Sequence, residues 1–590
     1  MKSILLGKDK QSGEDVRIPK SAFQTHLHLI GGTGKGKTTA IHTMLHPLLR
    51  DPLDPACFII VDRLGNLSEE LLLWMASPDF CTDEVRERLV YLQPAREDCV
   101  LPFNPLVYDT QGHGYYKVER ATEIILRAWE SVNIEAMPRL ARWTFNAFWA
   151  AAQLGLTIAD CAHFLMPGSP FHAPLLQMLP GALRAEWQEI TSARSAEAMR
   201  ILDSSRNRLK PYFESNILRR MFGCTENRLD MARFMREGKI VLIDLAPRNR
   251  LASQLANTIG SLIINEVLAT ARSLPRGQRY NTYLLLDEFQ NFIGPDMETA
   301  LPEVRQLGLR LILSHQGFSQ LKKGDYDLTP LIFQAQSRMM FGVQGEDADL
   351  LAHELASITF DPRKIKDEVY SRRQLISGHE TIELTSWSNA DSKSNQWSQT
   401  YGKNWGKHEN VTHGTEKDTR GEGKSNADSE GRSDGSTSGH TQTRGGHETL
   451  KPIYDSFMEL SSRTYVSFDE QKAEWAREVR NLATGEALLR LVNDPKLYRV
   501  RVKRSTPGYL GYDLETISRQ FPEVLEAVDR LIEQNFASNL FMSGEQVDRE
   551  TELRLQAVLN PPLQITSKPV VDAAAPPTTP TADQPQNPFT

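Results

Sequence analysis

The chain has 590 residues, of which 40% are hydrophobic and 24% charged, so its composition is that of a globular protein. This composition excludes collagen-like, wholly disordered and disulfide-scaffold proteins, and the length predicts about three or four domains. Lys and Arg number 68 against 75 Asp and Glu, which gives a net charge of -7. Contact with nucleic acid would therefore need a local basic surface, because the chain as a whole is acidic.

The five cysteines form no CxxC pair, which indicates a reducing compartment and gives no support for a zinc site. Charged residues come too early in the first eight positions for a signal peptide. The most apolar stretch, residues 147–166, carries Asp160 and His163 and predicts a buried helix rather than a membrane span. The sequence therefore predicts a cytoplasmic protein with no membrane span of its own.

Residues 1–20 predict two short strands around a polar turn, and beyond them apolar runs alternate with amphipathic stretches. This alternation predicts an α/β fold with a mostly parallel sheet and helices on both faces. The candidate strands are short and almost continuously hydrophobic, as parallel strands buried on both faces are. They are residues 26–30, 58–61, 89–92, 240–245, 283–286, 309–313 and 339–343.

Between residues 108 and 236 the hydrophobic pattern is helical throughout, and no strand pattern interrupts it. We predict an all-α domain over 108–236, inserted between two parts of one α/β core at 1–107 and 237–377. Helices are expected within the insert at residues 118–131, 138–154 and 182–209.

Residues 378–450 are dominated by Ser, Gly, Thr, Asn, Asp, His and Lys, and a pentamer, SNADS, occurs in them twice. Such a segment cannot bury a core, so either disorder or a long, two-sided polar hairpin is expected. Its tryptophans, Trp387, Trp397 and Trp405, are candidates for stacking on bases, although a flexible spacer is the favoured interpretation.

A C-terminal α/β and helical region is predicted at 451–572, followed by a disordered tail at 573–590 that is rich in Pro, Thr and Gln. The pattern predicts a half-exposed strand at 498–504 and helices at the remaining periodic stretches. These helices are expected at 469–482, 515–541 and 545–559.

Residues 31–38 read GGTGKGKT and match the phosphate-binding pattern G-x-x-x-x-G-K-[ST], between an apolar strand and a helical run. The glycines let backbone N–H groups surround phosphates, Lys37 reaches the β- and γ-phosphates, and the Thr38 hydroxyl ligates Mg²⁺. The cofactors predicted are therefore ATP and Mg²⁺, the alternative being a chance glycine-rich turn. The Lys35 side chain is expected to point to solvent. The predicted nucleotide-binding residues are Gly31, Gly32, Thr33, Gly34, Lys35, Gly36, Lys37, Thr38 and Thr39.

An apolar strand at 283–286 runs into two carboxylates, Asp287 and Glu288. Hydrolysis of a nucleotide needs a carboxylate that holds a water of Mg²⁺ and a base that polarises the attacking water. We assign Asp287 to the metal and Glu288 to the water, the alternative being an ordinary acidic strand end. Gln316, at the tip of the next strand, is predicted to sense the γ-phosphate, with His315 a packed or hydrogen-bonded neighbour.

Arg305 lies 18 residues after Asp287 and is the candidate for a cation that a neighbouring subunit inserts into the site. The alternative is a solvated helix arginine. Arg310 and Arg338 are the competing candidates for the same role.

Several of these motifs resemble those of the HerA-FtsK superfamily of DNA-pumping ATPases. The strand and loop at 28–38 do so, and VDRLGNL at 61–67 is similar to the superfamily's Asp-x-x-Gly-[Asp/Glu]-Leu signature, with Asn66 in place of the acid. PFNPL at 102–106 is also similar to a segment of the group. Three further motifs resemble type IV secretion coupling proteins of the TraG/TraD kind: DEFQNF at 287–292, EVRQLGL at 303–309 and SHQ at 314–316.

The resemblance covers about residues 4–375 and, more loosely, 451–505. It implies a RecA-like P-loop ATPase domain in a homohexameric ring, with Lys37 and Thr38 binding ATP and Mg²⁺. It also implies that Arg305 is an arginine finger acting across a subunit boundary, and that the insert is an all-alpha domain facing DNA and partner proteins. Membrane-bound coupling proteins begin with transmembrane helices, whereas this chain reaches the phosphate loop by residue 31, which favours a soluble relative.

Three functions remain open at this point. The first is an ATP-driven motor that moves DNA through a ring, whose pore contacts the DNA largely without reading sequence. The second is a coupling or docking ATPase that recruits a protein or nucleoprotein substrate, with a relaxase, nuclease or secretion channel as partner. The third is a HerA-like motor of a DNA repair or defence complex. The candidate DNA-contacting residues, each also explicable as a charged surface loop, are Lys322, Lys323, Arg363, Lys364, Lys366, Arg372 and Arg373.

Overall fold

The computed structural model describes residues 2–108, 111–127, 137–248, 250–292, 303–323, 326–392, 406–411, 420–425 and 439–560. The chain forms two compact units, residues 1–360 with 468–590 and residues 361–467, and each is described by itself. The tail predicted at 573–590 lies outside the described residues.

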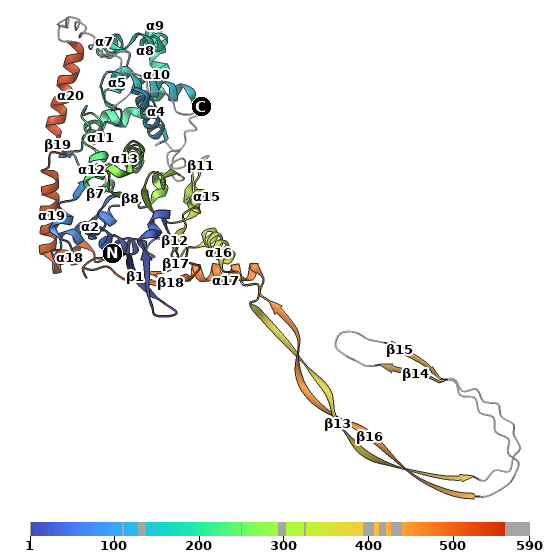
Figure 1. Ribbon diagram of the computed structural model, residues 1–590. Helices are drawn as coiled ribbons and strands as arrows, with labels where there is room; N and C mark the ends of the chain where they lie inside the picture. The colour runs from blue at the N-terminus through green and yellow to red at the C-terminus, as the bar shows by residue number, and fades with distance from the viewer. Residues whose placement is uncertain are drawn as a thin grey trace, which may run out of the picture. The chain divides into compact units, whose positions relative to one another are not determined.

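Within the described part of the first unit, eleven strands form one mixed sheet in the order β2-β1-β18-β17-β12-β3-β9-β8-β4-β7-β5. Some of these strands, among them β1, β12, β17 and β18, are labelled in Figure 1. From β12 to β5 neighbouring strands are parallel, whereas β17, β18, β1 and β2 pair antiparallel. The expected α/β fold with a mostly parallel sheet is therefore confirmed. The strands are β1 (Ser3–Asp9), β2 (Asp15–Pro19), β3 (Leu27–Ile30), β4 (Ala56–Asp62), β5 (Leu89–Leu92), β7 (Ile240–Asp244), β8 (Asn281–Leu286), β9 (Leu309–His315), β12 (Ser337–Met340), β17 (Glu486–Arg490) and β18 (Leu497–Val502).

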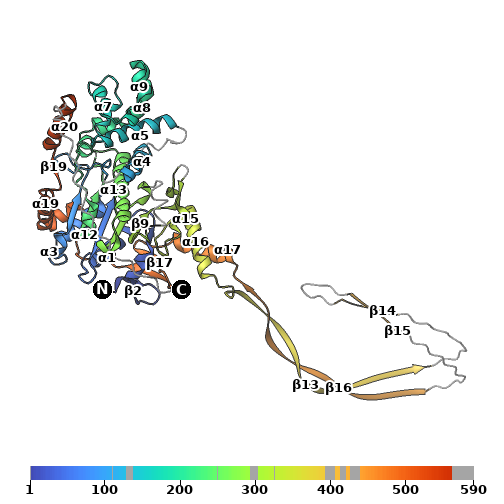
Figure 2. The same cartoon turned by 45° about the horizontal axis from the view of Figure 1, so that its top comes forward.

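The central strands are buried because helices pack against the sheet (Figure 2). Every residue of β4 and of β7 is buried, which explains their uninterrupted hydrophobic sequences. In α13, Gly260 lets the helix approach the sheet closely, since a Cβ there would lie 2.6 Å from Leu245. The helices of this core are α1 (Lys37–Leu49), α2 (Asn66–Ala76), α12 (Met231–Glu237), α13 (Ser253–Ser273) and α16 (Gly345–Thr359).

The strand order brings the predicted motifs to one edge of the sheet. β9 lies between β3 and β8, with Ile30 opposite His315 and Leu286 opposite Leu313. Because the three strands are parallel, their carboxyl ends meet at the same edge, where ligands of open α/β sheets bind. The phosphate loop, the two carboxylates and Gln316 all follow these ends.

The segment between β6 (Cys99–Val100) and β7 is helical, as the sequence predicts, but the buried helix expected over 147–166 is wrong. α5 ends at Gln153 because Gly155 adopts a left-handed backbone with φ 66°. Backbone bonds from Gly155 to Ala152 and from Leu156 to Ala151 close the end of the helix as a Schellman motif. The helices of this insert are α4 (Gln111–Arg127), α5 (Pro138–Gln153), α6 (Cys161–Phe164), α7 (His172–Met178), α8 (Gly181–Glu186), α9 (Gln188–Ser192), α10 (Ser195–Glu214) and α11 (Asn216–Met221).

The C-terminal residues run back along this unit as α18 (Leu514–Gln520), α19 (Pro522–Phe536), β19 (Met542–Ser543) and α20 (Gly544–Leu559). The single helix expected over 515–541 is interrupted at Phe521, because Pro522 begins a new helix. The side chain of Asn535 hydrogen-bonds both the N–H and the C=O of Tyr91, at 2.9 and 2.8 Å. These are backbone groups on the outermost strand, β5, and Asn535 supplies their hydrogen-bond partners.

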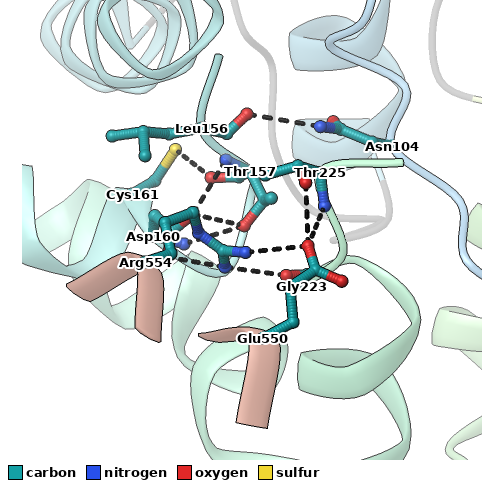
Figure 3. Close-up of polar contacts among 9 residues, drawn as sticks. All are labelled: Asn104, Leu156, Thr157, Asp160, Cys161, Gly223, Thr225, Glu550 and Arg554. Atoms are coloured by element: carbon teal, nitrogen blue, oxygen red, sulfur yellow. Dashed lines mark hydrogen bonds and ion pairs between the residues drawn. The ribbon is translucent and has the colours of Figure 1, made fainter. Parts of the chain in front are cut away.

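A buried ion pair between Arg554 of α20 and Asp160 joins α20 to the helical insert (Figure 3). Arg554 donates to both carboxylate oxygens of Asp160, at 3.1 and 3.2 Å, and to the Gly223 carbonyl at 2.7 Å. Glu550, one turn earlier, accepts from the backbone and the hydroxyl of Thr225. The C-terminal helices therefore connect the edge of the sheet to the insert.

The second unit is built on a long antiparallel hairpin of β13 (Ile365–Ser392) and β16 (Gly439–Tyr465). Within its described residues, β14 (Gly406–Val411) also pairs with β15 (Arg420–Ser425). The hairpin alternative is therefore the one that the structure shows, and its strands extend beyond 378–450 on both sides. The three tryptophan side chains considered for base stacking lie outside what the structure describes.

Among the described helices, none combines the length and the apolar character that a membrane span requires.

Candidate nucleotide-binding and hydrolysis site

The loop of residues 31–36 joins β3 to α1 and has the backbone of a phosphate cradle. Gly34 and Gly36 adopt left-handed conformations, with φ 71° and 110°, which glycine accepts without strain. At Gly31 a Cβ would lie 2.4 Å from the Phe341 Cβ, so only glycine fits. No side chain caps the N-terminus of α1, whose first amides are left for an anion.

Lys37 is buried at the start of α1 and donates from Nζ to the carbonyls of Gly31 and Gly32, at 2.6 and 3.4 Å. Burial lowers its pKa, while the nearby charges of Glu288 and Asp287 act in the opposite direction. The Lys35 side chain, expected to point to solvent, is only half-exposed, because it lies against Gly342, where a Cβ would be 3.3 Å from its Cε.

Asp287 follows β8 directly and its residue is 8% exposed. Burial and the charges of Asp62 and Glu288 raise the pKa of Asp287 to about 7, whereas Lys37 opposes this shift. Asp62, at the end of the neighbouring β4, accepts hydrogen bonds from two backbone N–H groups of the following loop and from that of Ser68 in the first turn of α2. The sequence assigned no role to Asp62, and the acidic end of an apolar strand is the signal that would have found it.

Glu288 adopts a left-handed backbone with φ 53°, which is uncommon for a residue with a Cβ and typical of functional sites. Its carboxylate accepts a hydrogen bond from Gln316 Nε2 at 3.0 Å. The Gln316 Oε1 in turn accepts from the Thr33 hydroxyl at 3.1 Å. The structure thus brings the loop, Glu288 and Gln316 together.

Arg305 is not brought to the site of its own chain. It is exposed and precedes β9, whereas the phosphate loop follows the carboxyl end of the neighbouring β3. The guanidinium charge of Arg305 lies near His26. Burial is the main cause that lowers the pKa of His26 to about 4, and the charge of Arg305 acts in the same direction. Of the competing arginines, Arg338 is fully buried in an ion pair with Glu354, and Arg310 donates to the Tyr283 hydroxyl at 2.6 Å.

A cleft of about 300 Å³ adjoins the loop and contains both Thr38 and Thr39. One wall is formed by His42 and Glu70, whose Nε2 and Oε2 atoms are 3.0 Å apart. The rest of its lining comes from the C-terminal part of the chain, which sequence reasoning missed because no local pattern links these residues to the loop. They are Thr484, Arg504, Ser505, Leu510 and Gly511.

The residues at this edge suit Mg²⁺. The Thr38 hydroxyl and the Asp287 carboxylate are hard oxygen donors, the kind that this ion prefers. The described residues contain no group of three or more His, Cys, Asp or Glu that would hold a metal alone.

The family model described as the TraM recognition site of TraD and TraG matches residues 281–404. A comparison with curated protein sequences finds no match. Among solved structures, the plasmid coupling protein TrwB in complex with a non-hydrolysable ATP analogue is 15% identical, with 86% of this chain and 90% of that chain covered and a TM-score of 0.49. TrwB in complex with ADP and Mg²⁺ is 16% identical, with 85% and 89% covered and a TM-score of 0.47.

VirB4 of Thermoanaerobacter pseudethanolicus is 14% identical, with 60% of this chain and 87% of that chain covered and a TM-score of 0.38. The expected resemblance is confirmed by the family model: over residues 281–404 the chain is similar to coupling proteins of the TraD and TraG kind.

Proposed function

We propose that this protein is an ATP-hydrolysing motor that moves DNA and works as a homohexameric ring. The observation that carries the proposal is the bridge that Gln316 makes between Thr33 of the phosphate loop and Glu288. A nucleotide hydrolase needs a phosphate cradle, a base for the attacking water and a group that senses the γ-phosphate. We assign these roles to the loop with Thr33, to Glu288 and to Gln316, and the two hydrogen bonds that join these side chains support the assignment.

In this proposal the loop amides and Lys37 bind the phosphates, and Thr38 with Asp287 would hold Mg²⁺. The bound ion would neutralise phosphate charge. Glu288 polarises the attacking water, and Gln316 turns from Glu288 toward the γ-phosphate. The exposed Arg305 enters the site of a neighbouring subunit, where it would stabilise the charge of the transferring phosphoryl group.

DNA is contacted through its phosphates by exposed basic side chains, largely without reading of bases. Lys322 lies six residues beyond Gln316, in a short hairpin of β10 (Lys322–Lys323) and β11 (Tyr326–Asp327), and its side chain is 66% exposed. This proximity would link the nucleotide sensor to a DNA-contacting loop. In the second unit, Arg363, Arg372 and Arg373 are exposed. The Lys323 side chain lies outside the described part of the structure.

A second candidate is a docking ATPase that recruits a protein or nucleoprotein substrate, such as a relaxase, a nuclease or a secretion channel. Two observations favour it: the match to the TraM recognition site at 281–404, and the long hairpin of the second unit, whose first strand lies within that match. The same ATPase chemistry would serve this function, with a protein in place of DNA as the activator.

The test is ATP hydrolysis by the purified protein with and without single- and double-stranded DNA, beside Lys37→Ala and Glu288→Gln. The motor predicts turnover that DNA stimulates several-fold and that both substitutions abolish. Turnover that is indifferent to every DNA would favour the docking ATPase, and turnover that persists in Glu288→Gln would refute the assigned site.

A further inference from the structure

Two histidines beside the site are hydrogen-bonded to each other in the core. His28 lies in β3, three residues before Gly31, and His315 ends β9, one residue before Gln316. Both are fully buried, their Nε2 atoms are 2.6 Å apart, and their ring planes differ by 11°. The proposed chemistry uses neither ring.

The partners of the two rings allow one arrangement of protons. Arg338 Nε donates to His28 Nδ1 at 2.9 Å, so the His28 proton is on Nε2 and points at His315. The His315 Nε2 therefore accepts, and its Nδ1 donates to the Gly317 carbonyl at 3.0 Å. A second proton on either ring would set a donor against a donor.

Electrostatics agree with a neutral pair. Burial lowers the pKa of His315 to about 3 and that of His28 well below its usual value, and the charge of Arg338 acts in the same direction on both. Histidine buried in this way remains uncharged at neutral pH.

The chain of hydrogen bonds continues to α16 at its other end. Arg338 is fully buried, forms an ion pair with Glu354 and donates to the Ile332 carbonyl at 3.1 Å. The Glu354 carboxylate also accepts a hydrogen bond from the guanidinium of Arg490, in β17, at 2.7 Å. The orientation of His28 is therefore fixed by Arg338 of the adjacent β12, which is held in turn by groups from α16 and β17.

His315 contacts the elements that carry the hydrolytic residues. Its ring meets the ring of Phe289 edge-on, with centroids 5.3 Å apart, and Phe289 directly follows Glu288. On the other side it meets Phe318, with centroids 5.6 Å apart. A rotation of His315 would displace both Gln316, its neighbour in sequence, and the residue after Glu288.

The geometry points to His28 and His315 as positioning residues for ATP hydrolysis. The neutral pair holds the tip of β9 so that Gln316 and Glu288 meet beside the phosphate loop, while neither ring touches the nucleotide. This inference rests on the proposed ATPase function. It predicts that breaking the bond between the rings slows the chemical step and leaves nucleotide binding intact.

Two substitutions of His28 separate the donor from the acceptor. In His28→Asn, the side-chain oxygen takes the place of Nδ1 and can still accept from Arg338, but no N–H group reaches His315. In His28→Gln, the longer side chain brings an amide nitrogen near the position of Nε2 and so restores a donor to His315. The measurements are kcat and KM for ATP, the affinity for a fluorescent ATP analogue, and the thermal midpoint, with turnover expressed per nucleotide-binding site. His172→Asn removes another buried histidine, in the helical insert, and is the matched control.

We expect His28→Asn to lower kcat about tenfold with analogue affinity unchanged, His28→Gln to recover part of that loss, and His172→Asn to match the wild type. An active wild type with an equally active His28→Asn would overturn this inference alone. So would losses of kcat and nucleotide affinity in the same proportion, or a His28→Gln no better than His28→Asn. A wild type without turnover would overturn the proposed function as well.

Discussion

Gln316 and Glu288 face each other across the ends of two neighbouring strands, and the Gln316 amide nitrogen donates to the Glu288 carboxylate at 3.0 Å. The same amide accepts from the Thr33 hydroxyl, which fixes which of its ends points to the carboxylate. One side chain therefore contacts both the phosphate loop and the proposed base. A γ-phosphate beside the loop would compete for that amide and so change the surroundings of Glu288.

Replacing Gln316 by Ala should lower kcat for ATP at least about tenfold and change the affinity for an ATP analogue little, because its role is confined to the reacting phosphate. Steady-state kinetics and analogue titration measure the two effects. Gln320→Ala, at an exposed position four residues on, is the control and should behave as the wild type. An equal loss of affinity and kcat would assign Gln316 to binding instead.

The raised pKa of Asp287 predicts how stability depends on pH in the protein without nucleotide. Because this pKa is about 7 against the ordinary value of 3.8 for an aspartate, the folded chain holds a proton between about pH 4 and 7 that the unfolded chain has lost. Stability therefore falls as pH rises through that window, by at most about 1.4 kcal/mol per pH unit from this group.

Asp287→Asn removes this contribution, so its advantage over the wild type in denaturant unfolding should grow from pH 4 to pH 7 and then level off. A stability difference between the two proteins that is constant with pH, or that shifts in favour of the wild type between pH 4 and pH 7, would contradict the shifted pKa.

Arg305 and Lys37 should complement each other between subunits. Arg305→Ala and Lys37→Ala should each be inactive alone, because every site lacks a group. In a randomly mixed ring, roughly a quarter of the sites would combine an intact Lys37 with an intact Arg305 from the neighbour, so turnover should reappear. Lys37→Ala mixed with Glu288→Gln is the control and should stay inactive, since both residues belong to the same subunit's site. Absence of recovery in the first mixture would refute the intersubunit role.

Arg554 should contribute substantially to the stability of the first unit. Arg554→Ala leaves the buried Asp160 with Thr157 but without its cation, and we expect a loss of about 2–4 kcal/mol in denaturant unfolding. Arg519→Ala removes an exposed ion pair with Glu515 on α18 and should change stability by less than about 0.5 kcal/mol. Equal effects of the two substitutions would show that the contact in Figure 3 does not hold α20 in place.

Local patterns in the sequence predicted the central strands and the loop well, because each strand is buried on both faces and reads as an apolar run. The meeting of Gln316 with Glu288 was predicted less directly, from strand tips alone. The hydrogen bond between them depends on β9 lying between β3 and β8. A local sequence pattern cannot predict this strand order.

Long-range pairing explains what the sequence did not predict. β18 pairs with β1, although almost the whole length of the sequence separates the two strands. The local pattern at 498–504 therefore predicted a strand, but it did not indicate that this strand joins the main sheet or that it leads into residues lining the nucleotide cleft. The helix expected over 147–166 failed for a local reason: the apolar run continues past Gly155, but the backbone there turns left-handed and ends the helix.

The central claim, that ATP hydrolysis moves this protein along DNA, is tested most directly by displacement. The wild type is incubated with ATP and either a triplex on double-stranded DNA or streptavidin on a biotinylated single strand, and release is followed over time. We expect release on at least one substrate, and this release should require ATP and be lost in Glu288→Gln. DNA-stimulated ATP turnover without release from either substrate would contradict it.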